Sequence, residues 1–205
     1  LFRSDAEDPN EILVMAVGGH VPYFSSTYDN PQYVVRFRSH DGGLTWDNGT
    51  NITYDIYDLY NNGAVGKAKG IFLTSGRIMQ SRYIKVGDYY RLYIAHPFRG
   101  EDDQACFVIY SDDFGETWQV LGGAQTIASD GKDESKAEEL PDGSVMISSR
   151  VQSGGRTMNV FAYTDAAKGE GVWSSSSVPV PMQSGKVNAC NGETLVLPAR
   201  RNGDG

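Results

Sequence analysis

An eight-residue pattern, Ser-x-Asp-x-Gly-x-Thr-Trp, occurs twice and constrains the fold of this chain more than any other feature. It begins at Ser39 and again at Ser111, and each copy directly follows a run of β-strand composition. A third, decayed copy runs from Tyr163 to Gly169 and leads to Trp173. Repetition of a turn sequence after successive strands is typical of folds built from repeated antiparallel units.

The residue types of this pattern predict a self-contained turn between two strands. The Asp carboxylate accepts hydrogen bonds from the turn backbone and from neighbouring side chains. The Gly adopts backbone angles that other residues resist, and the Thr returns the chain to a strand. The Trp covers the turn with a large apolar face. Because none of these roles requires a ligand, the pattern predicts architecture and carries no chemistry of its own.

Between the repeats, the chain reads as many short strands separated by polar turns, and helical periodicity is nearly absent. The expected strands are Ile12–Val17, Gln32–Arg38, Gly70–Leu73, Arg77–Ile84, Tyr89–His96, Ala105–Ser111, Ser144–Ser149, Met158–Thr164 and Thr194–Pro198. Many short antiparallel strands indicate a sandwich, a barrel or a propeller. The internal repetition selects the propeller among them.

Composition excludes several classes of partner. The chain has 205 residues and a formal net charge of −8, and an acidic protein binds nucleic-acid phosphates poorly. Its apolar runs are too short for a membrane span. Because His20, His40 and His96 lack the spacing of metal ligands, no catalytic metal and no cofactor is expected. Cys106 and Cys190 are interpreted as small buried apolar residues, with a disulfide left open.

The stretch from Asp133 to Arg150 contains the candidate chemistry. It reads as a strand, a Pro-Asp-Gly turn and a second strand, with Glu134 before the first strand and Arg150 at the end of the second. These ends lie on the same side of an antiparallel hairpin, so a carboxylate and a guanidinium are expected to converge. The alternative is a solvated rim pair of little worth. Strand alternation also predicts that at least one of Glu138 and Glu139 lies on the surface.

These motifs resemble those of a known enzyme family. The repeated turn resembles the Asp box of sialidases, which also occurs in other propellers, including non-enzymatic ones. The hairpin resembles the bacterial sialidase segment D-E-N-K-x-x-E-L-x-D-G-x-h-h-h-N-S-R, with Ser135 and Ser148 in place of Asn. From Gly66 to Arg150 the order of features follows that of bacterial sialidases. The resemblance implies an all-β fold, a six-bladed β-propeller only partly represented here, with residues 1–205 forming one incomplete catalytic domain.

The resemblance also implies roles for four residues. Glu134 would pair with a tyrosine nucleophile, and Arg150 would be the second of three arginines that grip the sialic acid carboxylate. Asp29, in the loop before the first Asp box, would be the acid/base catalyst. Its setting, Asp-Asn-Pro, is equally a turn composition. Arg3 would be the first arginine, although Phe2-Arg3 matches only half of the family's Phe/Tyr-Arg-Ile-Pro motif.

Two expected parts of the site lack clear counterparts. Arg200 or Arg201 would be the third arginine, but neither is followed by the strand that the family places there. None of the twelve tyrosines has the family context of the nucleophile. The Gly66 region follows the first Asp box so quickly that a blade's worth of sequence is expected to be absent. The uneven spacing of the two Asp boxes predicts that the blades differ in size and that part of the domain lies outside this sequence.

The resemblance implies an exo-α-sialidase that hydrolyses terminal sialic acid from glycoconjugates with retention of configuration. Sialylated glycans would be its partners, and the enzyme would be secreted, periplasmic or at the cell surface. Two alternatives stay open. One is a non-catalytic Asp-box propeller that binds glycans or proteins, and the other is a trans-sialidase.

Overall fold

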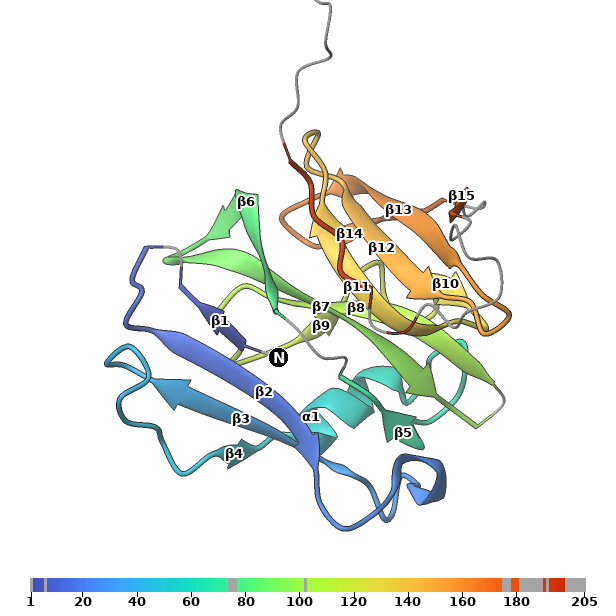
Figure 1. The fold of residues 1–205 in the computed structure, drawn as a ribbon, viewed down its shortest axis with the longest axis horizontal. Helices are drawn as coiled ribbons and strands as arrows, with labels where there is room; N and C mark the ends of the chain where they lie inside the picture. The colour runs from blue at the N-terminus through green and yellow to red at the C-terminus, as the bar shows by residue number, and fades with distance from the viewer. Residues whose placement is uncertain are drawn as a thin grey trace, which may run out of the picture.

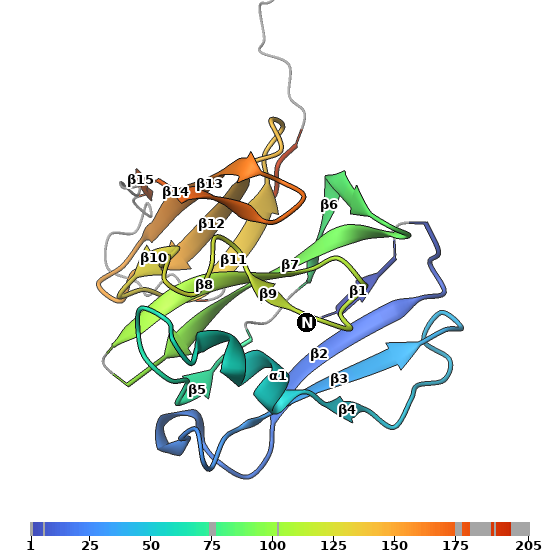
Figure 2. The ribbon, with the colours of Figure 1, turned by 180° about the vertical axis from the view of Figure 1, so that it is seen from behind.

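A computed structural model describes residues 2–5, 7–73, 77–101, 103–174, 178–180, 190 and 192–197, with the side chains of 2–4 and 178–180 left out of the description. Three antiparallel sheets follow one another along the chain, and Figures 1 and 2 show them as successive curled layers. This arrangement is consistent with part of a β-propeller. No helix in the described part is long and apolar enough to cross a membrane.

The first sheet has the order β1-β2-β3-β4, with β1 at Phe2–Ser4, β2 at Ile12–Gly18, β3 at Tyr33–Ser39 and β4 at Thr50–Asn51. The second sheet contains β5 at Gly70–Ile71, β6 at Met79–Val86, β7 at Tyr89–Arg99, β8 at Gln104–Ser111, β9 at Gln119–Val120 and β10 at Ser129–Asp130. The third sheet contains β11 at Asp133–Glu139, β12 at Val145–Arg150, β13 at Arg156–Asp165, β14 at Glu170–Trp173 and β15 at Val178–Val180.

Most of the predicted strands are confirmed with small shifts at their ends. The strand expected at Thr194–Pro198 is wrong for residues 194–197, which form no strand, while Pro198 lies outside the described residues. The sequence also gave no sign of helix α1, Thr53–Tyr57, which continues into the 3-10 turn η2 at Asp58–Tyr60. Five helical residues are too few to produce a readable 3.6-residue period.

The expectation that a blade is absent between the two repeated turns is not met in the described residues, because the first and second sheets are direct neighbours. The stretch between the turns contains β4, α1 and η2, followed by the first strands of the second sheet. Ile56, Tyr57 and Tyr60 are fully buried there and join the core cluster that contains Leu13 of β2 and Phe107 of β8. The first and second sheets therefore pack against a shared core, and the uneven spacing reflects this helical connection.

The two repeated turns form the same hydrogen-bond network. Asp41 accepts hydrogen bonds from the Thr45 amide (2.9 Å) and hydroxyl (2.6 Å), and Asp113 accepts them from Thr117 at 2.8 and 2.6 Å. The hydrogen bonds from Thr45 hold the pKa of Asp41 at about 2. The expected turn geometry is therefore confirmed.

The second turn docks on the first sheet through two arginines of β3. Arg36 donates to the Gly115 carbonyl (2.9 Å), and Arg38 donates to the Phe114 carbonyl (2.5 Å). Both arginines also contact the Glu116 carboxylate, at 2.7 and 3.0 Å. The arginine-bearing face of β3 is thus the face between the sheets.

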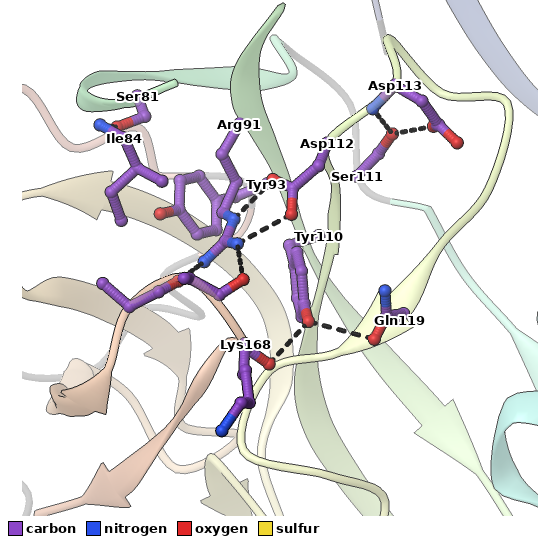
Figure 3. Close-up of polar contacts among 12 residues, drawn as sticks. Ser81, Ile84, Arg91, Tyr93, Tyr110, Ser111, Asp112, Asp113, Gln119 and Lys168 are labelled. Atoms are coloured by element: carbon purple, nitrogen blue, oxygen red, sulfur yellow. Dashed lines mark hydrogen bonds and ion pairs between the residues drawn. The ribbon is translucent and has the colours of Figure 1, made fainter. Parts of the chain in front are cut away.

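The third, decayed turn docks on the second sheet through Arg91 of β7, as Figure 3 shows. This fully buried side chain grips the Asp112 carboxylate with Nε and Nη2, at 2.6 and 2.7 Å. It also donates to the carbonyls of Ala166 (2.6 Å) and Ala167 (3.3 Å), and its guanidinium lies 4.3 Å from the centre of the Tyr110 ring. Arginine-to-turn contacts therefore join both pairs of adjacent sheets.

Replacing Gly115 with alanine should destabilise the protein more than the same change at Gly43. Both glycines have a positive φ, +82° and +91°, so each variant carries backbone strain of about 1 kcal/mol. A Cβ at Gly115 would lie 2.6 Å from Leu13 Cδ2, whereas the nearest atom at Gly43 is 3.5 Å away. This overlap with the core should add about 1–3 kcal/mol, measured by urea unfolding. Equal losses in the two variants would contradict the inter-sheet docking.

A buried histidine lies in the core of the second sheet. His96 and Tyr60 are both fully buried, and the Tyr60 hydroxyl donates to Nε2 of His96 at 2.7 Å, while Nδ1 faces the Pro97 carbonyl at 3.2 Å. Burial lowers the pKa of His96 from 6.5 to about 4. The imidazole is therefore neutral in the folded protein at neutral pH.

Stability should fall as the pH drops from 6.5 towards 4, because the unfolded histidine binds a proton in that range and the folded one does not. The loss amounts to about 3 kcal/mol and is absent above pH 6.5. Urea unfolding at pH 7 and pH 4 measures it. His96→Gln should be less stable at pH 7 but lose less stability on acidification than the wild type. An unchanged slope in His96→Gln would refute this assignment.

Candidate active site

The hairpin of β11 and β12 brings together the two residues that the sequence singled out. Asp133 pairs with Arg150 in the antiparallel register, and the register shifts between Asp133 and Ser135, which places Glu134 in a bulge. Arg150 Nη1 donates to Glu134 Oε2 at 3.1 Å and lies 3.8 Å from Asp133 Oδ2. The expected convergence of carboxylate and guanidinium is therefore confirmed.

This ion pair is not a solvated rim pair. The side chains of Arg150 and Glu134 are only 17% and 15% exposed, and that of Asp133 is 25% exposed. Charges this far from water are weakly screened, so their interaction is stronger than that of a surface pair. Both side chains nevertheless keep some contact with solvent.

Arg156 was missed by the sequence reasoning and lies beside this pair. It starts β13 directly opposite Arg150 in the sheet. It donates to the carbonyl of Glu134 (3.0 Å) and to the carbonyl and hydroxyl of Ser148 (2.6 and 2.8 Å). The signal that could have found it is its place after the Gly154-Gly155 turn, which returns the chain to the same end of the sheet.

Lys136 was also missed, and it lies on β11 two positions after Glu134. The residue is 5% exposed, and burial lowers the pKa of its ammonium group. In the described part of the chain no carboxylate lies within 4 Å of it, although it lines a water-sized cavity with Glu193 and Arg77. Lys136 is therefore a further buried cationic side chain on the strand that carries Glu134.

The expectation that Glu138 or Glu139 lies on the surface is wrong. They are 4% and 0% exposed, because the neighbouring sheet supplies partners for both. Glu138 is ion-paired with Arg77 and Arg82, and Glu139 accepts a hydrogen bond from the Ser81 hydroxyl at 2.6 Å. With both of these carboxylates held at the far end of β11, Asp133 and Glu134 are the strand's carboxylates at the end where Arg150 lies, and Glu134 is the nearer of the two.

Asp29 lies in the loop between β2 and β3, which Figure 1 shows at the same side of the molecule as the ends of β7 and β12. It is exposed and sits in a tight turn, where the Thr27 amide donates to the Asn30 carbonyl at 3.2 Å. No hydrogen bond or ion pair joins Asp29 to Glu134 or Arg150 among the described residues. The structure thus shows the turn that the sequence suggested and does not bring Asp29 into contact with the pair.

Arg99 anchors this loop to the second sheet. Its Nη2 donates to the carbonyls of Tyr23 (2.7 Å) and Ser26 (2.6 Å), and its guanidinium lies 5.4 Å from the centre of the Tyr23 ring. The Ser26 hydroxyl adds a bond of 2.5 Å to the Lys69 carbonyl. These contacts fix the loop on the end of the sheets that carries the candidate pair.

The remaining sequence candidates are only partly visible. Arg3 pairs with Leu13 through the backbone of β1, but its side chain lies outside the described residues, as do Arg200 and Arg201 entirely. Cys106 is buried as expected and its thiol lies 3.2 Å from the Asp133 carbonyl. Cys190 is exposed, so the expectation of burial was wrong for it, because it lies in a turn and not in a central strand. Both cysteines are free.

No family model and no curated protein matches this sequence. Solved structures do share its fold. A Hadza microbial sialidase is 23% identical with a TM-score of 0.57, and the alignment covers 73% of this chain and 28% of the sialidase chain. The leech intramolecular trans-sialidase is 21% identical with a TM-score of 0.52, covering 75% and 20%. The Trypanosoma rangeli sialidase is 14% identical with a TM-score of 0.56, covering 83% and 26%.

This chain spans between 20% and 28% of the length of these neighbours. At these identities the likeness concerns the fold. The chain therefore has the sialidase-like fold that sialidases and trans-sialidases share, represented here by three antiparallel sheets.

Proposed function

We propose that this chain is part of an exo-α-sialidase with a six-bladed β-propeller catalytic domain, which removes terminal sialic acid from glycoconjugates. The observation that carries the proposal is the partly buried Glu134–Arg150 pair at 3.1 Å, on a fold shared with sialidases. The Trypanosoma rangeli neighbour was solved with 2,3-difluorosialic acid as a covalent intermediate, which supports an acidic sugar as the substrate class.

Arg150 would bind the substrate carboxylate in this proposal. A guanidinium presents a planar fork of donors that matches a carboxylate, and lysine cannot reproduce it. Arg3 would provide a second guanidinium. On substrate binding the carboxylate would compete with Glu134 for Arg150, which leaves Glu134 available as a base.

Glu134 would act as the base towards a tyrosine nucleophile that is not identified in this chain. A carboxylate nucleophile would approach the substrate's own carboxylate with like charge, whereas a tyrosine activated by a neighbouring glutamate avoids this repulsion. Asp29, on the loop anchored by Arg99, would serve as the acid/base catalyst. Such double displacement retains the configuration of the sugar.

The test is hydrolysis of 3′-sialyllactose by the intact natural protein that contains residues 1–205. Release of free sialic acid supports the proposal. Two neighbours are intramolecular trans-sialidases, and one of them was solved with 2,7-anhydro-Neu5Ac, so release of that product would favour the trans-sialidase alternative. Binding of the sialylated glycan without any turnover would overturn the enzyme proposal in favour of a glycan-binding propeller.

A further inference from the structure

Arg156 occupies a position where a positive charge is energetically unfavourable. It lies directly opposite Arg150 on the neighbouring strand and is 9% exposed. Like charges in facing positions of a sheet repel each other. Burial lowers the pKa of Arg156, and nearby acidic groups such as Glu134 offset this only in part, so the folded protein holds this cation at a penalty. Packing alone would favour a neutral residue at this position.

The contacts of Arg156 link two neighbouring strands of the sheet. One guanidinium bonds to two neighbouring strands at once, through the Glu134 carbonyl on β11 at 3.0 Å and the Ser148 carbonyl on β12 at 2.6 Å. Its Nε also donates to the Ser148 hydroxyl at 2.8 Å. The first anchor point is the main chain of the candidate base itself. The second is two residues before Arg150 and on the same face of the strand.

The bulge at Glu134 makes such an anchor necessary. The register shifts between Asp133 and Ser135, so the regular ladder does not determine the orientation of Glu134. The Glu134 amide is bonded to the Asp133 side chain at 2.9 Å, and its carbonyl is bonded to Arg156. Side chains therefore hold both backbone groups of this residue.

We propose that Arg156 is a positioning residue for the Glu134–Arg150 pair. Its guanidinium fixes the main chain at Glu134 and Ser148, so that the carboxylate and the Arg150 guanidinium meet in one geometry. Ser148 takes part in this role through its hydroxyl. The proposal rests on the proposed function only in treating the pair as the binding site for an anionic sugar.

The experiment compares Arg156→Lys with a matched control, Arg82→Lys. Both arginines donate to a main-chain carbonyl of β11, Arg156 at Glu134 and Arg82 at Glu139 at the other end of the strand. Each variant keeps the charge and loses the fork. Three measurements are made on the intact protein: amide hydrogen exchange at residues 134–136 and 148–150, the dissociation constant for N-acetylneuraminic acid, and KM and kcat for 3′-sialyllactose.

Arg156→Lys should raise amide exchange at 134–136 and 148–150 at least tenfold and weaken N-acetylneuraminic acid binding by a similar factor. Arg82→Lys should change neither. Ser148→Ala should show a smaller effect in the same direction. In Arg156→Lys, KM for 3′-sialyllactose should rise under conditions in which urea unfolding shows that the variant is still fully folded. Wild-type affinity and exchange in Arg156→Lys would overturn the proposal.

Failure of the proposed function is distinguishable from failure of this inference. If the wild-type protein neither binds nor hydrolyses the sialic acid compounds, the proposed function fails, and the exchange data alone decide the role of Arg156. Faster exchange confined to the segments around Glu134 and Arg150 would then still support positioning. Equal exchange in Arg156→Lys and Arg82→Lys would refute it.

Discussion

Replacing Arg150 with alanine should weaken binding of a sialic acid ligand by about 2–5 kcal/mol, which corresponds to a loss of roughly 30- to 4,000-fold in affinity. The reason is that the guanidinium is 17% exposed, so its interaction with a carboxylate is little screened by water. The variant also leaves Glu134, 15% exposed, without its ion-pair partner. Calorimetric titration of the intact protein with N-acetylneuraminic acid measures the change.

Arg150→Lys separates charge from geometry in this experiment. Lysine keeps the positive charge but lacks the planar fork. The affinity of Arg150→Lys for the ligand should therefore lie between that of the wild type and that of the alanine variant. Thermal unfolding of both variants shows whether the fold is retained. Undiminished binding by a folded Arg150→Ala variant would remove this residue from the site.

Replacing Arg91 with alanine should destabilise the protein by about 3–5 kcal/mol, the largest stability effect expected in this chain. Arg91 is fully buried, and its removal leaves the Asp112 carboxylate, 21% exposed, without its bidentate partner. The carbonyls of Ala166 and Ala167 lose their donor at the same time. Because a domain is typically stable by about 5–15 kcal/mol, the variant should unfold at a much lower urea concentration.

A double-mutant cycle with Asp112→Ala tests the cause of this loss. If the penalty comes from an unpaired buried carboxylate, the double variant should be less destabilised than the two single losses added together. Arg91→Met, which fills the space without charge, should still lose the hydrogen bonds to the third turn. A cost below about 1 kcal/mol for Arg91→Ala would show that the clamp between the sheets contributes little.

The repeated turns show how far local sequence could be read. Asp41 and Asp113 accept hydrogen bonds from residues four positions further along, so the whole network lies within eight residues. The same holds for the Glu134–Arg150 hairpin, whose two strands are adjacent in the chain. Contacts of this kind follow from residue type and spacing, and both were predicted.

The burial of individual side chains was harder to predict than the local contacts between them. Trp118 is 6% exposed and Trp46 is 43% exposed, although both close the same turn sequence. The difference arises because Arg36 and Arg38 hold the second turn against the first sheet. Likewise, Glu138 and Glu139 are buried because partners reach them from β6 and the residues just before it, about 60 positions away in sequence. These partners are Arg77, Ser81 and Arg82.

The sequence by itself determined the repeated turns, most of the strands and the meeting of Glu134 with Arg150, because each depends on residues that are close along the chain. The tertiary structure alone decided which charges are buried, how one sheet grips the next through Arg91, and how Arg156 supports the candidate pair. Those features depend on partners that only chain packing brings within hydrogen-bond distance. A buried charge persists only where such partners are present, so its place cannot be read from its own neighbours in sequence.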